Sequence, residues 1–137
     1  MTLTPREIVD KMFAKDDFSQ WLGITFLEVS PGYCKIKMAV REEMTNGFDI
    51  AHGGISFSFA DSAFAFASNS RGKHAVSIET SISHTRAIKA GDILIAEATE
   101  TNVSNKLGHY DVEVVNQNKK IVAIFKGTVF RKDVEWV

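Results

Sequence analysis

Alternating hydrophobic and polar positions run through much of the chain and predict β-strands. In residues 33–40, Cys34, Ile36, Met38 and Val40 alternate with polar positions, which is typical of a strand with one buried and one wet face. Further strands are predicted over residues 24–29, 74–84, 93–103, 107–116 and 121–131. Short turn-forming segments join the later strands, so the sheet should be largely antiparallel.

Two short helices are predicted near the N-terminus. Thr4 is a suitable cap for a helix that begins at Pro5, and Glu7 completes the capping box. A second helical turn is predicted over residues 17–22, and it should end at Gly23, which tolerates the left-handed conformation of a helix end.

One long helix is predicted over residues 54–70 and closes at Gly72. Its large apolar residues point to several sides, so it must be covered nearly all round: Ile55, Phe57, Phe59, Phe64 and Phe66. Its small residues recur at helical spacing and let strands approach closely: Ser56, Ala60, Ala63 and Ala67. The order of elements predicts one α+β domain over residues 1–137, with an antiparallel sheet wrapped around the central helix.

Composition and charge narrow the possible functions. Apolar residues make up 45% and charged residues 24% of the chain, as in ordinary globular proteins. Lysine plus arginine number 16 against 17 acidic residues, a balance that disfavours binding to nucleic acid or an anionic membrane. We find no apolar run that would span a bilayer and no secretory leader, and the single Cys34 suits a reducing compartment, so we expect a cytoplasmic protein.

Asp61 is the only ionisable residue within the apolar helix. An unpaired buried carboxylate costs several kcal/mol, so the position needs either a solvated rim, a buried hydrogen-bond donor or a function. His52, Gly53 and Gly54 stand at the start of the same helix, where free backbone N–H groups and the helix dipole favour an anion. The sequence therefore places an anion-binding point and a carboxylate on one element.

Three segments at or near this helix stand out together: Asn46-Gly47-Phe48, Ala51-His52-Gly53-Gly54 and residues 59–67. They closely resemble the active-site region of the hotdog-fold thioesterases of the phenylacetate-degradation (PaaI) type. Arg86, Gly91-Asp92 and the late stretch 110–127 extend the resemblance over nearly the whole chain. The resemblance implies a hotdog fold and hydrolysis of an acyl-CoA thioester. It also implies a homodimer or a dimer of dimers with active sites between subunits, and neither a metal nor a redox cofactor.

The resemblance also implies roles for individual residues. The Gly54 N–H would stabilise the oxyanion that forms on the thioester carbonyl, with Gly53 beside the substrate. Asp61 would act either as general base or as nucleophile, and the sequence leaves both routes open. Asn46 and His52 match positions that orient the acyl and thioester groups. The remaining match is Ser77, at a position that helps hold the attacking water in some members.

Helix geometry adds a prediction about the subunits. Gly54 and Asp61 are seven residues apart, hence roughly 10 Å along the helix axis at 1.5 Å per residue. One carbonyl group cannot easily contact both, so we predict that each active site pairs Gly54 of one protomer with Asp61 of its neighbour.

Several other residues are candidates for substrate binding, each with a structural alternative. Arg86 and Lys89 would receive phosphates of the CoA nucleotide, with Lys106 a weaker third candidate, or they are ordinary solvated charges. Phe57 and Phe64 lie on the Asp61 side by helical spacing and would line an acyl pocket, or they belong to the core. His74, His84 and His109 lack ligand partners at metal spacing and are interpreted as structural or surface residues.

Two other functions remain open at this point. One is a non-catalytic module that binds or senses acyl-CoA, which would keep the pocket without the chemistry. The other is a hotdog enoyl-CoA hydratase, which usually needs a histidine beside the carboxylate. The sequence does not fix the acyl group, although aryl-acetyl groups are the expectation from the resemblance, nor the choice between dimer and tetramer, nor the biological pathway.

Overall fold

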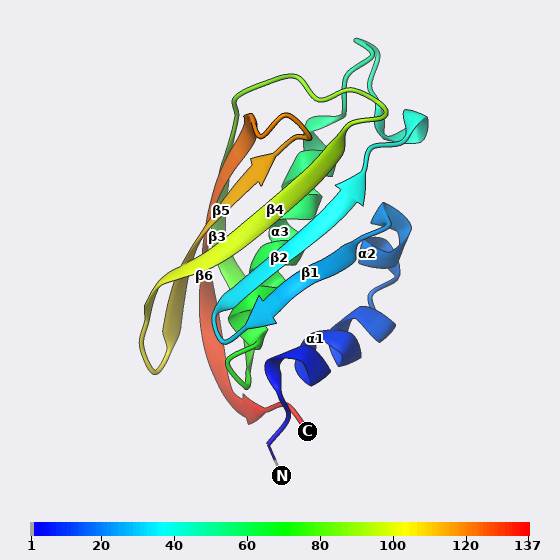
Figure 1. Cartoon of the computed structure of the whole chain (residues 1–137). Coiled ribbons are helices and arrows are strands. Elements are labelled where there is room, and N and C mark those ends of the chain that lie inside the picture. Colours follow the sequence, from blue (N-terminus) through cyan, green and yellow to red (C-terminus); the bar gives the residue numbers. More distant parts are fainter. Residues whose placement is uncertain (1) are drawn as a thin grey trace.

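The computed structural model describes residues 2–137 and contains one curved sheet with three α-helices on its inner side (Figure 1). The helices are α1 (Pro5–Ala14), α2 (Asp17–Leu22) and α3 (Gly53–Asn69), with a short 3-10 helix, η1, over Glu42–Met44. The strands are β1 (Thr25–Ser30), β2 (Tyr33–Ala39), β3 (Lys73–His84), β4 (Ile93–Val103), β5 (Leu107–Val115) and β6 (Ile121–Glu135).

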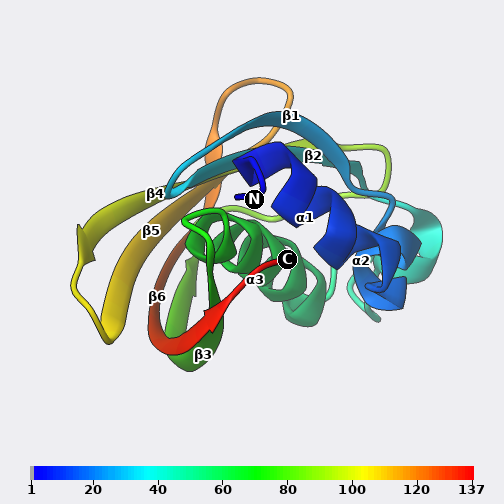
Figure 2. The same ribbon diagram turned by 90° about the horizontal axis from the view of Figure 1, so that it is seen from below.

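All six strands pair antiparallel in the order β1-β2-β4-β5-β6-β3. Because α3 connects β2 to β3, the chain crosses the inner face of the sheet and places β3 at the edge opposite β1. Figure 2 shows the sheet curling around α3, with α1 and α2 beside the helix. The predicted α+β architecture, with an antiparallel sheet around one long helix, is confirmed.

The predicted elements match the observed ones closely. The capping box of α1 is present: Glu7 N donates to Thr4 Oγ1 at 3.1 Å, and Thr4 N donates to the Glu7 carboxylate at 3.0 Å. Gly23 ends α2 in the left-handed region with φ 79°. The sequence pattern missed η1 and placed the end of β6 four residues early, at Arg131 instead of Glu135.

α3 packs closely against the sheet because residues with small side chains lie at the contact on both elements. The four small residues predicted to form the flat stripe are all buried: Ser56, Ala60, Ala63 and Ala67. The tightest point lies on β6, where a Cβ added to Gly127 would stand only 2.6 Å from Cζ of Phe64. Glycine at this position therefore leaves room for the tip of the Phe64 ring against the strand.

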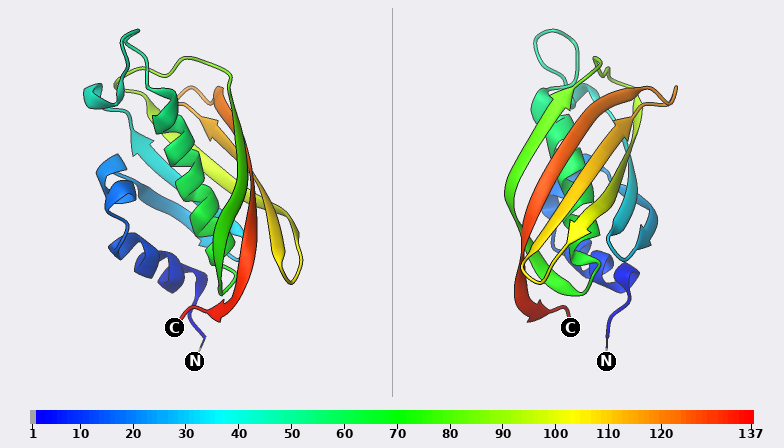
Figure 3. Two further views of the ribbon diagram at one scale, coloured as in Figure 1. Left: turned by 180° about the vertical axis from the view of Figure 1, so that it is seen from behind. Right: turned by 90° about the vertical axis from the view of Figure 1, so that its left-hand side faces the viewer.

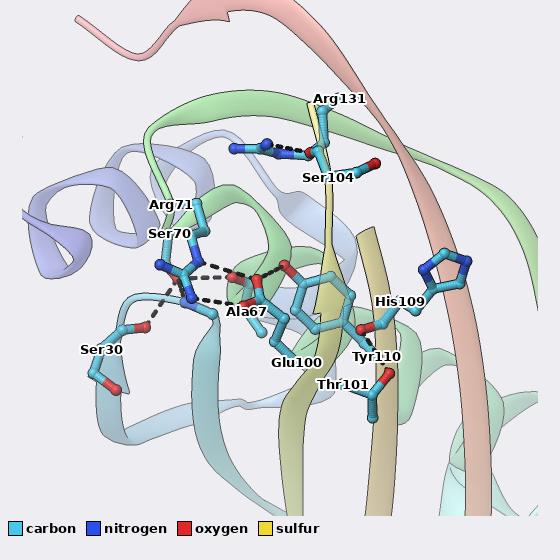
Figure 4. A network of polar contacts seen from close by, with 11 residues as sticks. Ser30, Ala67, Ser70, Arg71, Glu100, Thr101, Ser104, His109, Tyr110 and Arg131 are labelled. Atoms are coloured by element: carbon cyan, nitrogen blue, oxygen red, sulfur yellow. Dashed lines mark hydrogen bonds and ion pairs between the residues drawn. The ribbon is translucent and has the colours of Figure 1, made fainter. Parts of the chain in front are cut away.

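A polar network joins the end of α3 to the middle of the sheet (Figure 4). Arg71 donates two hydrogen bonds to the Glu100 carboxylate, at 3.0 and 2.6 Å, and the Tyr110 hydroxyl donates a third at 2.9 Å. Burial raises the pKa of Glu100, but these hydrogen bonds outweigh it and hold the pKa below its usual value. The network fixes the C-terminal end of α3 against β4 and β5.

Two parts of the structure stay open. Along α3, a stripe that includes Ser58, Asp61 and Ala65 is only partly covered, so the helix is less enclosed than its apolar sequence predicts. Beside it, β3 pairs with β6 alone among the described strands and carries the exposed Val76 and Ile78. Figure 3 (left) shows α3 lying between α1 and this edge strand. Among residues 2–137, no helix is long and apolar enough to cross a bilayer.

Replacing Gly127 with alanine should destabilise the protein by about 1–3 kcal/mol, because the added methyl group displaces the Phe64 ring in a filled core. Urea unfolding followed by circular dichroism measures the change. Gly47→Ala is the matched control, since a Cβ there meets nothing within 4 Å. Equal stability of the two variants would show that Phe64 moves aside without cost.

Candidate functional site

Asp61 lies on the partly open stripe of α3 with its side chain half-buried. Its helix neighbours Ala60 and Ser62 are buried, so the carboxylate sits at the border between the core and the open channel. Burial raises the pKa of Asp61, and the nearby negative charge of Asp16 raises it further. The site therefore holds a carboxylate in surroundings that make it more basic than an ordinary aspartate.

A chain of hydroxyl contacts connects α2 to α3 next to Asp61. Asp16 caps α2 by accepting a hydrogen bond from Ser19 N at 2.9 Å, and its second oxygen accepts one from Ser19 Oγ at 2.6 Å. Ser19 Oγ lies 2.8 Å from Ser62 Oγ, and both serines are buried. This contact holds α2 beside Asp61, and it explains why the negative charge of Asp16 raises the pKa of Asp61.

The N-terminal end of α3 is exposed and carries the second group of candidate residues. His52 is the N-cap, and its Nδ1 accepts a hydrogen bond from Gly54 N at 2.9 Å. In this structure the candidate oxyanion donor is therefore engaged by its own neighbour. Asn46 lies in the preceding loop, where its Oδ1 accepts from Phe48 N at 2.8 Å, and the Phe48 ring is 85% exposed.

A pocket of about 360 Å³ opens beside this helix end. It brings together three predicted residues, Asn46, Gly53 and Arg86, and adds Ser56 and His84. His84 Nδ1 lies 3.1 Å from Ser56 Oγ, and its Nε2 would lie 3.4 Å from a Cβ added to Gly53. The sequence pattern gave no reason to select His84, because its proximity to Gly53 arises only when β3 packs against α3.

Ser77 lies on β3 with its side chain directed to the same inner side. It is paired in register with Val129, which is 1% exposed and faces α3, and residues directly opposite in an antiparallel pair share one face of the sheet. Ser77 itself is exposed. Its hydroxyl therefore faces the channel beside α3 and not the outer surface.

The remaining candidates do not gather at one point within the chain. Arg86 and Lys89 lie in the loop after β3, whereas Lys106 is in the β4–β5 turn at the far end of the sheet, near the ring of Phe130. Phe64 is 1% exposed and packs on Tyr110 and Phe125, so its ring points into the core, away from the open stripe.

Phe57 is partly buried and packs on Phe125, at 5.6 Å between ring centroids. Cys34 is fully buried, and burial raises the pKa of its thiol to about 12, which suits a core residue and not a nucleophile. Within residues 2–137, no three His, Cys, Asp or Glu side chains are grouped so that they would hold a metal ion.

Comparison with known proteins assigns this arrangement to a family. Residues 48–123 match the model of the thioesterase superfamily. An esterase described as putative from Archaeoglobus fulgidus is 45% identical over 90% of this chain and 80% of its own length. The acyl-coenzyme A thioesterase PaaI of Escherichia coli is 40% identical over 88% of this chain and 86% of its own length.

Solved structures agree with these sequence relationships. The structure of the E. coli PaaI protein superposes with a TM-score of 0.94 at 37% identity, covering 96% of this chain and 95% of that one. A Streptococcus mutans protein bound to acetyl-CoA matches with a TM-score of 0.80 at 26% identity, over 82% of this chain and 91% of its own. The hotdog fold that the sequence predicted is confirmed.

The raised pKa of Asp61 implies a cost to stability. The folded state binds a proton more readily than the unfolded chain does, so ionised Asp61 destabilises the fold above its raised pKa, and the cost vanishes below the pKa of an unfolded aspartate. Asp61→Asn should therefore melt at a higher temperature than the parent at pH 7, and the difference should shrink as the pH falls through the raised pKa. Thermal unfolding between pH 7 and pH 4 measures this, and a difference that grows toward acid pH would contradict it.

Proposed function

The chain belongs to the thioesterase superfamily and is a thioester hydrolase, and on that premise we propose that it cleaves acyl-CoA with Asp61 as the catalytic carboxylate. The observation that carries the proposal is the position of Asp61, half-buried on the open stripe of an otherwise apolar helix with its pKa raised. In the reaction, oxygen adds to the thioester carbonyl, the carbon–sulfur bond breaks, and the CoA thiolate leaves and takes up a proton.

Asp61 acts in its ionised form. As general base it takes a proton from water as the water attacks the carbonyl, and as nucleophile it attacks the carbonyl itself. The raised pKa makes it a stronger base than an ordinary aspartate. Ser77 faces the same channel, where its hydroxyl is suited to hold the attacking water.

The backbone N–H of Gly54 serves as the oxyanion donor, with His52 as the group that occupies it between turnovers. Gly54 is exposed, and its N–H already donates to an acceptor, His52 Nδ1, at 2.9 Å, which supports this role. When a substrate carbonyl replaces His52 Nδ1 as the acceptor, the Gly54 N–H exchanges one hydrogen bond for another. Because this N–H is never left unpaired, the exchange costs little free energy. Once released, the His52 ring is free to contact the thioester region.

The catalytic unit is a homodimer formed through the open edge of β3. An exposed edge strand with apolar side chains such as Val76 and Ile78 favours pairing with a second strand. Antiparallel pairing of two β3 strands about a two-fold axis sets the two α3 helices side by side in opposite directions. Asp61 of one protomer then approaches Gly54 of the partner subunit, which overcomes their separation of roughly 10 Å along one helix. A dimer of two such dimers is compatible with this arrangement.

CoA binds at the pocket beside the start of α3. Asn46, Gly53 and Arg86 line this pocket, and Lys89 lies in the same loop as Arg86, so two cations stand where the CoA phosphates would reach the surface. The S. mutans relative bound to acetyl-CoA supports this ligand class. Lys106, at the far end of the sheet, contributes only if a second subunit brings it near. We place the activity in the cytoplasm, where the buried Cys34 thiol stays reduced.

Asp61→Ala should lower kcat for acyl-CoA hydrolysis at least about a hundredfold, because it removes the group that delivers or activates the attacking oxygen. Release of free CoA, followed with a thiol reagent across aromatic and straight-chain acyl-CoAs, measures the loss. Fold and oligomeric state, checked by circular dichroism and light scattering, should match the parent. Turnover near the parent level would exclude Asp61, and tight acyl-CoA binding by the parent without thiol release would indicate a binding module.

A mixture of two inactive variants tests the shared active site. Gly54→Pro removes the candidate N–H at a position in the first helical turn, where proline is tolerated. Dimers formed from equal amounts of Asp61→Ala and Gly54→Pro chains should recover about one quarter of parent activity, because half of the dimers are mixed and each mixed dimer has one intact site. Co-expression with two affinity tags yields the mixed species. No recovery in purified mixed dimers would place both groups in one protomer.

A further inference from the structure

A second, mainly apolar cavity lies between the end of α1 and the C-terminal end of the chain. Its volume is about 560 Å³, larger than that of the pocket beside the start of α3. The chain after β6 returns across the end of α3 toward α1 (Figure 2). The residues that line the cavity are Lys11, Met12, Ala14, Lys15, Asp16, His74, Trp136 and Val137.

Its wall is held in place by a set of contacts around Trp136. The Trp136 ring stacks on the His74 ring, with centroids 4.1 Å apart, and Trp136 Nε1 donates to Asn69 Oδ1 at 3.0 Å. Asn69 also binds the backbone of β3 through the N–H and the carbonyl of Ala75, at 3.0 and 3.1 Å. Because the indole N–H is satisfied within the wall, the surface that Trp136 offers to the cavity is apolar.

The opposite wall comes from α1. Met12 is partly buried and packs against the core, and its flexible thioether adapts to the shape of a ligand. Lys11 Nζ donates to the Val137 carbonyl at 2.6 Å, so this ammonium group is held at the rim by the wall itself. The cavity thus combines a rigid aromatic side, an adaptable side and a polar rim.

This cavity is connected to the part of α3 that carries Asp61 through contacts of its wall. Asp16 lines it and reaches Ser62, the residue after Asp61, through the hydroxyl of Ser19. At the other end, Asn69 supports the Trp136 wall and lies eight residues after Asp61, hence roughly 12 Å further along the helix axis. The cavity therefore occupies the side of Asp61 that faces away from the start of α3.

In the proposed dimer the two ends of one substrate would meet these two pockets. Antiparallel pairing of the β3 strands sets the His74 end of one strand beside the His84 end of the other. CoA in the pocket beside Gly53 of the partner subunit would then present its thioester to Asp61, with the acyl group directed along α3 toward Trp136.

We propose that this cavity binds the acyl group of the thioester and makes the enzyme selective for extended hydrophobic acyl chains over phenylacetyl. The inference rests on the function proposed above. A phenylacetyl group spans only part of the distance from Asp61 to Trp136 and leaves most of the cavity empty, whereas a long chain fills it and buries its methylene groups. Each buried methylene group raises kcat/KM roughly fourfold.

Acyl-CoAs from acetyl to dodecanoyl, with phenylacetyl-CoA as the aromatic member, test this in the full-length protein. For the parent, kcat/KM should rise with chain length and exceed that for phenylacetyl-CoA. Met12→Trp fills the cavity and should lower kcat/KM for dodecanoyl-CoA at least about tenfold while changing that for acetyl-CoA less than about twofold. If Met12→Trp does not fold, Ala14→Phe fills the same space from a more exposed position.

Leu27→Trp is the matched control, since Leu27 is 44% exposed on β1 and does not line the cavity; its chain-length profile should equal that of the parent. Hydrolysis that is independent of chain length, or an equal loss on acetyl-CoA and dodecanoyl-CoA in the filled variants, overturns the acyl assignment and leaves the proposed function standing. Absence of thiol release from every acyl-CoA overturns both.

Discussion

The structure depends on one constraint: a helix that is apolar on nearly every side has to be removed from water. The sheet meets this constraint by curling around α3, and the curl requires close contact where strand and helix cross. Buried Ser56, Ala60, Ala63 and Ala67 on the helix provide that contact on one side. Gly127 provides it on the other, because the Phe64 ring occupies the space where any side chain would stand. The stripe that the sheet does not reach carries Asp61, the proposed catalytic carboxylate.

That uncovered stripe explains why the site is divided. The two features that the proposed mechanism uses are the amide groups at the start of α3 and the Asp61 carboxylate, and a rigid helix holds them too far apart to act on one carbonyl. In the proposed dimer, the edge of β3 that is unpaired within the described chain would bring them together in a second copy. Covering the stripe and completing the site would then be the same event, which would link burial of the helix to assembly of the subunits.

Most of the fold could be predicted from the sequence because its signals are local. Alternation set the strands, the Thr4 capping box set α1, and Gly23 set the end of α2. The direction in which each α3 side chain points was harder to predict. A helix with apolar residues on several sides does not show which side faces the sheet. Helical spacing placed Phe64 beside Asp61, whereas the ring packs against β6. His84 was interpreted as a structural or surface residue and Trp136 was not selected for a similar reason, since their contacts with Gly53 and Asn69 join segments distant in sequence.

The contacts of Trp136 and Met12 have a consequence for how such proteins diversify. The proposed chemistry sits on α3 and its leading loop, while the cavity between α1 and the C-terminal segment is built mainly from residues near the two ends of the chain, with His74 of β3. Trp136 bonds to Asn69 at the end of α3 and Met12 packs against the core, but none of the lining residues belongs to the part of α3 that carries Gly54 and Asp61. On the acyl assignment proposed above, changes at peripheral residues such as Ala14 would exchange one preferred thioester for another, with the reaction itself preserved.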